Sequence, residues 1–301
     1  MSEGTNRVAG TMGLVAERLL AAPYAVRLGL LLEAQEPERL RLRVPYKDEN
    51  SNPGRALHGG VAASAIHFAG ALAAQAGVED RAGMEAGTLD LSVVYLSAAI
   101  GEDIVAEAEV LRRGKEITYV DVLVRNDEGK RIAKGLVTYR CFDTRKNPAA
   151  RERQQVHHQP VDGGAGEVPP LARALAAVPF IARLGIAVES MHGGSARMRL
   201  PFHPNVADSD GAVHEGAVAA LVDTTGAMAS WSLVGLDLRY KASTVGIHLN
   251  YHLPAVGADV VAMGRTLRRN NEIFLNEVTV CDVPTGRVVA TGSVTYRIVV
   301  D

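Results

Sequence analysis

The feature that most constrains the fold of this 301-residue chain is an internal repeat with an offset of 156 positions. The register holds without a gap from residues 23–124 to residues 179–280 and then slips by one. Matched residues include His58 and His214, Tyr95 and Tyr251, and Leu111-Arg112-Arg113 and Leu267-Arg268-Arg269. A unit this long exceeds the 20–50 residues of solenoid repeats, so it is a whole small domain present twice.

Composition narrows the class of protein. A net charge of −2 gives no basis for non-specific nucleic-acid binding. No metal-ligand spacing accompanies the two cysteines, so a reducing compartment fits. The N-terminal residues lack the pattern of a signal peptide, and no run of 18 apolar residues indicates a membrane span. We therefore expect a cytoplasmic protein without a membrane or nucleic-acid partner.

Each half has the same predicted order of elements. A short helix (13–21, 171–177) precedes two strands, which in the first half are 28–35 and 39–44. A polar loop leads into a long helix, 59–76 or 215–233, and in the first half strands follow over 87–98, 103–112, 116–126 and 131–142. The segment 143–170 is polar and rich in turn residues, as a linker is. The predicted domains are 1–145 and 171–301, joined by a linker over 146–170.

The long helix 59–76 is rich in Ala and Gly and apolar nearly all round, which is typical of a buried helix. A buried helix followed by long strands indicates a sheet wrapped around it. The fold class is thus α+β, with one antiparallel sheet around one central helix in each half.

Leu57-His58-Gly59-Gly60 at the start of such a helix, with Asn52 six positions earlier, resembles the hotdog fold and, within it, the PaaI-type acyl-CoA thioesterases. His214-Glu215-Gly216, followed by Leu221-Val222-Asp223-Thr224-Thr225-Gly226, carries the resemblance in the second half. Such domains pair edge to edge, which implies an intramolecular pseudo-dimer here. In this family each site takes the loop Asn and His-Gly-Gly from one domain, and a helix Asp and a strand Ser or Thr from the other.

The two copies differ at these positions. By this resemblance, one composite site is complete: Asn52, His58, Gly59 and Gly60 face Asp223 and Thr244. The other combines Asp208, His214, Glu215 and Gly216 with His67 and Thr88. His67 replaces the family's catalytic Asp, and Glu215 replaces the first Gly. We therefore predict one working and one degenerate site.

Thioester hydrolysis needs donors for an oxyanion, which the N–H groups at a helix N-terminus provide, and a base or nucleophile, for which Asp223 is placed. Burial should raise the pKa of that carboxyl. Thr244 and Asn52 are expected to orient water or substrate, and His58 and Gly60 are expected to belong to the substrate-binding residues. For His67, a role as a core histidine is weighed against a role as a residual base or ligand. His58 and His214 are expected to shape the turn before each long helix. Two interpretations remain for the hairpin arginines Arg112, Arg113, Arg268 and Arg269. They are either solvent-exposed charges at turns or contacts for the phosphates of coenzyme A.

The expected activity is hydrolysis of an acyl-CoA thioester without a metal or redox cofactor, coenzyme A entering only as part of the substrate. Two alternatives remain open at this stage: a non-catalytic acyl-CoA-binding protein and a hotdog hydratase or dehydratase. The double-hotdog chain is expected to form a homodimer.

Overall fold

A computed structural model describes residues 13–76, 78, 84–145, 156–161, 168, 172, 175, 177–235, 237 and 239–299. The first half contains, in order, α2 (Pro23–Leu28), β1 (Leu31–Gln35), β2 (Arg39–Val44), the 3-10 turn η1 (Asp48–Asn50), α3 (Gly59–Ala76), β3 (Met84–Tyr95), β4 (Ile104–Arg113), β5 (Ile117–Arg125) and β6 (Arg131–Asp143). The second half repeats this order with α5 (Pro179–Leu184), β7 (Ala187–His192), β8 (Ser195–Leu200), η3 (Pro204–Val206), α6 (Glu215–Val234), β9 (Lys241–Tyr251), β10 (Val260–Asn270), β11 (Ile273–Asp282) and β12 (Val288–Val299).

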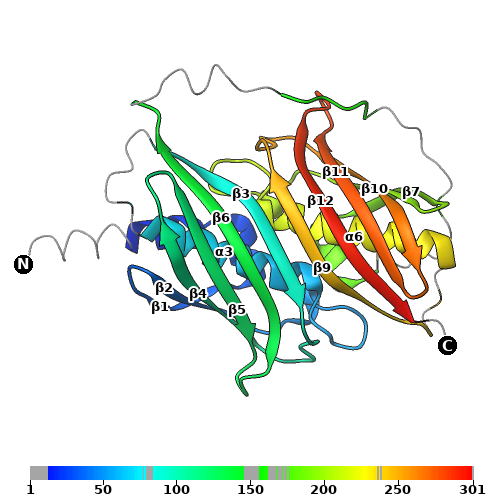
Figure 1. The fold of residues 1–301 in the computed structure, drawn as a ribbon, viewed down its shortest axis with the longest axis horizontal. Helices are drawn as coiled ribbons and strands as arrows, with labels where there is room; N and C mark the ends of the chain where they lie inside the picture. Colours follow the sequence, from blue (N-terminus) through cyan, green and yellow to red (C-terminus); the bar gives the residue numbers. More distant parts are fainter. Residues whose placement is uncertain are drawn as a thin grey trace, which may run out of the picture.

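The strands form one antiparallel sheet of twelve strands, in the order β1-β2-β4-β5-β6-β3-β9-β12-β11-β10-β8-β7 (Figure 1). The order is the same from either edge once each strand is exchanged for its repeat counterpart. At the centre, Ser92 pairs with His248, its own counterpart 156 positions later. A pseudo-twofold axis therefore passes through the β3–β9 seam, and the predicted tandem hotdog fold is confirmed.

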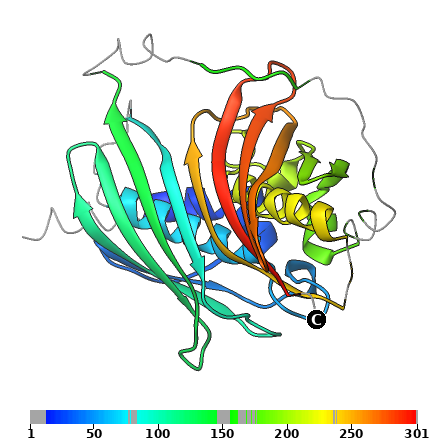
Figure 2. The same ribbon diagram turned by 45° about the vertical axis from the view of Figure 1, so that its right-hand side comes forward.

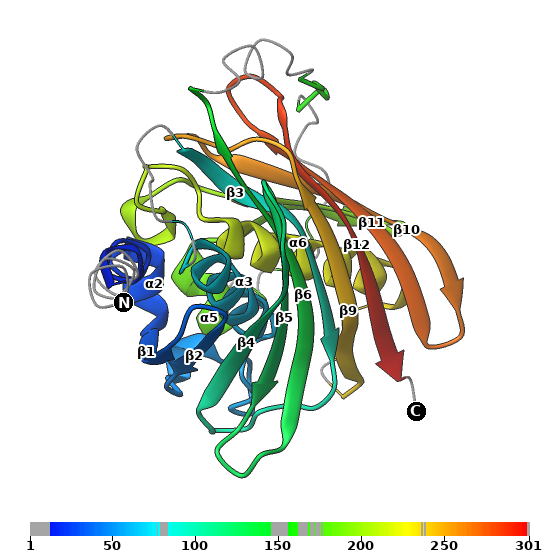
Figure 3. The same ribbon diagram turned by 60° about the vertical axis from the view of Figure 1, so that its left-hand side comes forward.

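Both long helices lie on the same side of the sheet, which curves around them (Figures 2 and 3). Every residue of α3 after Gly59 is buried, as is every residue of α6 from Gly216 to Trp231. By length and composition, α6 would pass as a membrane span, but 83% of its apolar window is buried inside the protein. The sheet and the neighbouring helix thus cover the apolar surface of α6, which is a core helix.

Small residues let the two helices approach closely at their N-terminal ends. A Cβ on Gly60 would lie 2.6 Å from Cβ of Ala220, and one on Gly216 would lie 3.0 Å from Oγ of Ser64. The Ser64 hydroxyl lies 2.7 Å from the carbonyl oxygen of Gly60 and 3.1 Å from that of Gly216. This contact brings the N-terminus of each helix into the other half.

The predicted ranges are close for most elements and wrong at 28–35. The helix 59–76 is confirmed, and the second long helix ends one residue later than predicted. Leu28 ends the helix α2, which was not predicted, and the strand begins only at Leu31. Gly29, with φ of 83°, ends that helix in a left-handed conformation, and its counterpart Gly185 does the same after α5.

The linker is only partly described, since 146–155, 162–167 and 169–170 lie outside the described residues. Within 156–161, His158 bridges to Arg287, and the Gln159 N–H donates to the carbonyl of Gly286. This part of the predicted linker therefore packs against the second half. The domain boundaries themselves stay a prediction.

Candidate active site

The first composite site joins the N-terminus of α3 to the middle of α6. Asp223, on α6, is buried, and Oγ1 of Thr244 at the start of β9 donates a hydrogen bond to its Oδ1 at 2.6 Å. A Cβ placed on Gly59 would lie 2.9 Å from Oδ2 of the same carboxylate. Half two thus supplies the carboxylate and half one supplies the helix end that faces it. Only glycine at position 59 leaves space between them.

Burial raises the pKa of Asp223 to about 6, and the hydrogen bond from Thr244 opposes that rise. The group is therefore mostly a carboxylate at neutral pH, but it is a much stronger base than an exposed aspartate. A group of this kind, in a site formed by two domains, suits either proton abstraction from water or nucleophilic attack.

His58 shapes the turn into α3. Its Nδ1 accepts the N–H of Gly60 at 2.9 Å, and its ring packs against Phe180 of half two with centroids 4.7 Å apart. Burial lowers the pKa of His58 to about 4, so the ring is neutral at physiological pH. The N–H of Gly60 is committed to this contact, which counts against its predicted use for binding substrate. The N–H of Gly59 has no partner within the helix and is the donor expected to face an oxyanion.

Tyr95 is a site residue that the sequence reasoning did not assign. Its hydroxyl donates to the carbonyl oxygen of Gly59 at 3.1 Å, and its ring comes within 3.4 Å of a Cβ position on Gly59. Burial raises the pKa of Tyr95, and the nearby charge of Asp223 adds to the rise. The signal was available, because Tyr95 and Tyr251 are identical at matched positions of the repeat.

Among the remaining predicted residues, Asn52 and Arg113 make hydrogen bonds away from Asp223. The Asn52 N–H donates to the carbonyl of Ala56 at 2.7 Å within the loop before α3, and a role of Asn52 in holding water or substrate stays a prediction. Arg113 donates to the carbonyl oxygens of Ala73 and Ala74 at the C-terminal end of α3. It thus satisfies a helix end, which counts against its predicted role in binding phosphate. Phosphate binding by Arg112, Arg268 and Arg269 stays a prediction.

The second composite site is filled by its own side chains. Nε2 of His67 lies 2.5 Å from Oε2 of Glu215 and 2.9 Å from Oγ1 of Thr88. The other carboxylate oxygen of Glu215 lies 3.4 Å from the backbone N–H of Thr88. Glu215 therefore places a carboxylate between the helix end and the strand, in the space that Gly59 leaves open in the first site. His67 is not an isolated core histidine but part of this cluster.

The turn at the second site keeps the geometry of the first. Nδ1 of His214 accepts the N–H of Gly216 at 3.0 Å, and the Tyr251 hydroxyl donates to the carbonyl of Glu215 at 3.0 Å. Oδ1 of Asp208, the counterpart of Asn52, accepts the backbone N–H groups of Asp210 and Ala212. The two sites thus share a framework and differ in the residues that occupy it.

Comparison with known proteins identifies the family of this chain. The family model described as the thioesterase superfamily matches residues 54–133 and 210–295, together more than half of the chain. Acyl-coenzyme A thioesterase 13 of Mus musculus is 30% identical over 106 residues, which are 35% of this chain and 74% of that protein. A Halobacterium salinarum protein, provisionally named an esterase, is 33% identical over 124 residues, which are 38% of this chain and 82% of that protein.

Several solved structures match nearly the whole chain. A protein of unknown function with a hotdog fold from Alicyclobacillus acidocaldarius has a TM-score of 0.64 and 16% identity, covering 95% of this chain and 98% of its own. An acyl-CoA thioesterase II from Mycobacterium marinum has a TM-score of 0.61 and 12% identity, covering 90% and 96%. At these identities the likeness concerns the fold. From the two family matches and the twelve-stranded sheet, this chain belongs to the thioesterase superfamily as a tandem of two hotdog domains.

Proposed function

We propose that this protein hydrolyses an acyl-CoA thioester to a carboxylate and free coenzyme A at the single composite site of Gly59 and Asp223. The observation that carries the proposal is the Asp223 carboxylate, buried, held by Thr244 and set against the N-terminus of a helix from the other half. A base and an oxyanion donor on opposite sides of one small space are what acyl transfer to water requires.

In the proposed reaction, Asp223 takes a proton from water while the water oxygen bonds to the thioester carbon. The carbonyl oxygen becomes an oxyanion, which the helix-end N–H of Gly59 stabilises, and the dipole of α3 adds to that effect. The C–S bond then breaks, and the sulfur leaves as the thiol after taking the proton. Direct attack by Asp223 would instead break the C–S bond, expel the coenzyme A thiolate and form a mixed anhydride. Water then hydrolyses that anhydride to the carboxylate and free Asp223, and the proton released is taken up by the thiolate. Thr244 holds the carboxylate in orientation for either route.

Free-thiol release from acetyl-, hexanoyl-, benzoyl-, dodecanoyl- and palmitoyl-CoA tests this proposal. Turnover of at least one ester by the full chain is expected. A folded protein that binds these esters without releasing thiol would favour the binding-protein alternative. A hydratase would change the absorbance of an enoyl-CoA without thiol release. The pair weighed for that alternative, Asp223 and His67, is not formed, because Asp223 contacts Thr244 and His67 contacts Glu215 and Thr88 in separate sites.

The pH dependence of kcat/KM should follow the titration of the Asp223 carboxyl. Because its carboxylate is the active form and burial raises its pKa to about 6, kcat/KM should rise as pH increases through about 6 and level off above 7. His58, with a pKa of about 4, should not titrate in this range. The measurement is kcat/KM from pH 5 to 8, with unfolding monitored in parallel. A flat profile over this interval would contradict the assignment of Asp223.

Tyr95→Phe should lower kcat about tenfold, the effect expected for losing one hydrogen bond of about 1.4 kcal/mol. The hydroxyl anchors the carbonyl of Gly59 and so fixes the first turn of α3 against Asp223. The matched control is Tyr251→Phe, which removes the same bond at the second site. Both variants should lose similar stability in urea unfolding, and only the first should lose activity. Equal kinetic losses would mean that Tyr95 acts through stability alone.

Several expectations accompany the proposal. The reaction should need no metal or redox cofactor, the location should be cytoplasmic, and the chain should form a homodimer. The family supports an acyl-CoA substrate in general terms.

A further inference from the structure

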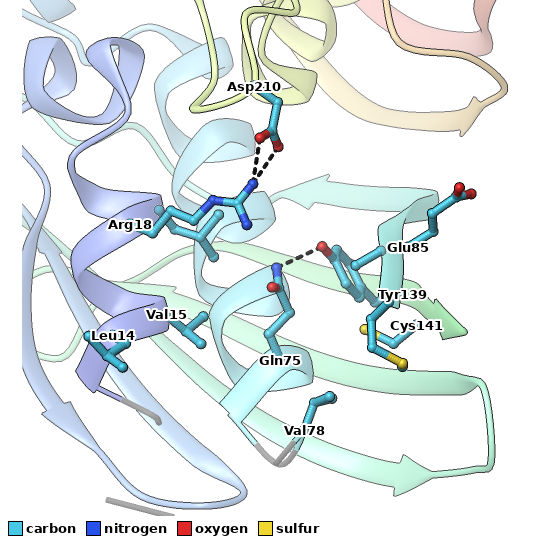
Figure 4. A pocket seen from close by; sticks show the side chains of 12 residues that line it. Leu14, Val15, Arg18, Gln75, Val78, Glu85, Tyr139, Cys141 and Asp210 are labelled. Atoms are coloured by element: carbon cyan, nitrogen blue, oxygen red, sulfur yellow. Dashed lines mark hydrogen bonds and ion pairs between the residues drawn. The ribbon is translucent and has the colours of Figure 1, made fainter. Parts of the chain in front are cut away.

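A cavity of about 720 Å³ lies at the C-terminal end of α3 in the first half (Figure 4). It is lined by Gln75 of α3, Met84 at the start of β3, Tyr139 of β6, and Asp210 from the loop of half two. An adjoining cavity of about 360 Å³ shares Glu85, Ala86 and Asp210 with it and reaches Thr88 and Glu215. Open space therefore extends from the edge of the second composite site, at Thr88 and Glu215, to the C-terminal end of α3.

The repeat shows what occupies the same path beside Asp223. Trp231 stands at the position of Gln75, Tyr240 at that of Met84, and Tyr296 at that of Tyr139. The indole Nε1 of Trp231 donates to the Tyr296 hydroxyl at 3.2 Å, where Gln75 donates to Tyr139 at 2.7 Å in the first half. The rings of Trp231 and Tyr240 lie nearly parallel, with centroids 6.4 Å apart. The second half thus has aromatic rings, Trp231 and Tyr240, at two positions where Gln75 and Met84 line the cavity of the first half.

These rings belong to the end of the Asp223 site. Trp231 is buried and follows Asp223 by eight positions on α6, a rise of about 12 Å along the helix. Tyr296 is the neighbour of Thr244 across the β9–β12 ladder, and Thr244 holds the Asp223 carboxylate. An acyl chain that passes between α6 and the sheet from Asp223 towards the helix end therefore meets the indole within about two to three helical turns.

We propose that Trp231 sets the acyl length of the Asp223 site and that its substrates carry short-chain or single-ring acyl groups. This inference rests on the proposed thioesterase function. Trp231 is fixed by the hydrogen bond to Tyr296 and by stacking on Tyr240, so it does not swing aside as a flexible side chain would. Forcing methylenes into such a packed region displaces side chains and backbone, and each added methylene that lacks space lowers transition-state binding.

The first measurement is the chain-length profile of kcat/KM for the wild type. It should fall at least about 100-fold between hexanoyl- or benzoyl-CoA and palmitoyl-CoA. Trp231→Ala should raise the palmitoyl-to-hexanoyl ratio by about 10- to 100-fold. Trp231→Gln copies the residue of the first half, and Trp231→Leu is a milder change in case the alanine variant unfolds. The control is Gln75→Ala, which alters the same repeat position away from Asp223 and should leave the ratio unchanged.

Binding gives a second measurement that does not need turnover. Trp231 is the only tryptophan in the chain, so its fluorescence reports on the end of this site. In Asp223→Asn, benzoyl-CoA should change that fluorescence at saturation and palmitoyl-CoA should compete weakly for the site. Binding of this kind without thiol release by the wild type would overturn the proposed function and keep the length limit.

Other outcomes would overturn the length limit and keep the proposed function, or would overturn both. Thiol release with an unchanged chain-length ratio in folded Trp231 variants would overturn the length limit and keep the proposed function. A wild type that prefers palmitoyl-CoA would also overturn the length limit. A protein that neither hydrolyses nor binds the short esters would overturn both.

Discussion

Asp223→Asn is expected to lower kcat about 1000-fold on any ester that the wild type hydrolyses, because the amide neither takes a proton from water nor attacks the thioester. His67 occupies the same position in the other half, so His67→Asn is the matched control and should keep most of the activity. The comparison is made by free-thiol release under saturating substrate. Equal losses in the two variants would mean that the working site has been assigned to the wrong half.

The same substitution should stabilise the fold at neutral pH. Folded Asp223 holds its proton up to about pH 6, whereas an unperturbed aspartate loses it near 3.8, so wild-type stability falls as pH rises between these values. Removing the charge should raise the free energy of unfolding at pH 7 by up to about 3 kcal/mol, less the lost bond from Thr244. The gain should disappear below pH 4. Urea unfolding of both proteins at pH 4 and 7 checks this, and it separates loss of chemistry from loss of fold.

The second large effect is the creation of a working second site. In an Asp223→Asn background, Glu215→Gly combined with His67→Asp should raise kcat at least about tenfold above the background. Glu215→Gly removes the carboxylate that fills the site, and His67→Asp supplies the base beside Thr88, while the turn of His214 and Gly216 is already in place. Thiol release by the triple variant is the measurement.

His67→Asp alone in the same background is the control for this design. It leaves Glu215 in the site and sets two carboxylates against one another, so it should not recover activity. A triple variant that folds and stays inactive would contradict the view that Glu215 and His67 are what disables the second site. Asp208, which caps its own loop where the first half has Asn52, would then be the next difference to exchange.

Much of this fold was available from the sequence because the repeat is a long-range constraint. It fixed two equivalent halves, and the apolar helix 59–76 within them indicated a sheet wrapped around a core helix. The meeting of Gly59 and Asp223 followed from the family resemblance rather than from the residues alone. The short helices α2 and α5 were missed, since six residues are too few for a clear periodic pattern. Pro23 and Pro179 at their first turns were the usable signal.

The contacts that decide the site could not be derived from local sequence. Glu215 and His67 are 148 positions apart, and their pairing depends on how two helices cross. Arg113 at a hairpin end looks like solvated charge until the end of α3 is placed beside it. The repeat matches Tyr95 with Tyr251, but the contact of Tyr95 with Gly59 depends on where β3 passes the helix. Each of these depends on packing, which periodicity does not encode.

The continuous β3–β9 seam also changes how the two sites can evolve. In a dimer of identical subunits, every substitution appears in both sites at once, so a change that closes one closes the other. Here each site draws on two different stretches of one chain, and Glu215 occupies the second site without altering the first. Because the two halves are covalently linked in one chain, assembly of the composite sites is also independent of protein concentration. Dilution that would dissociate a pair of separate hotdog subunits should therefore leave both composite sites of this chain assembled.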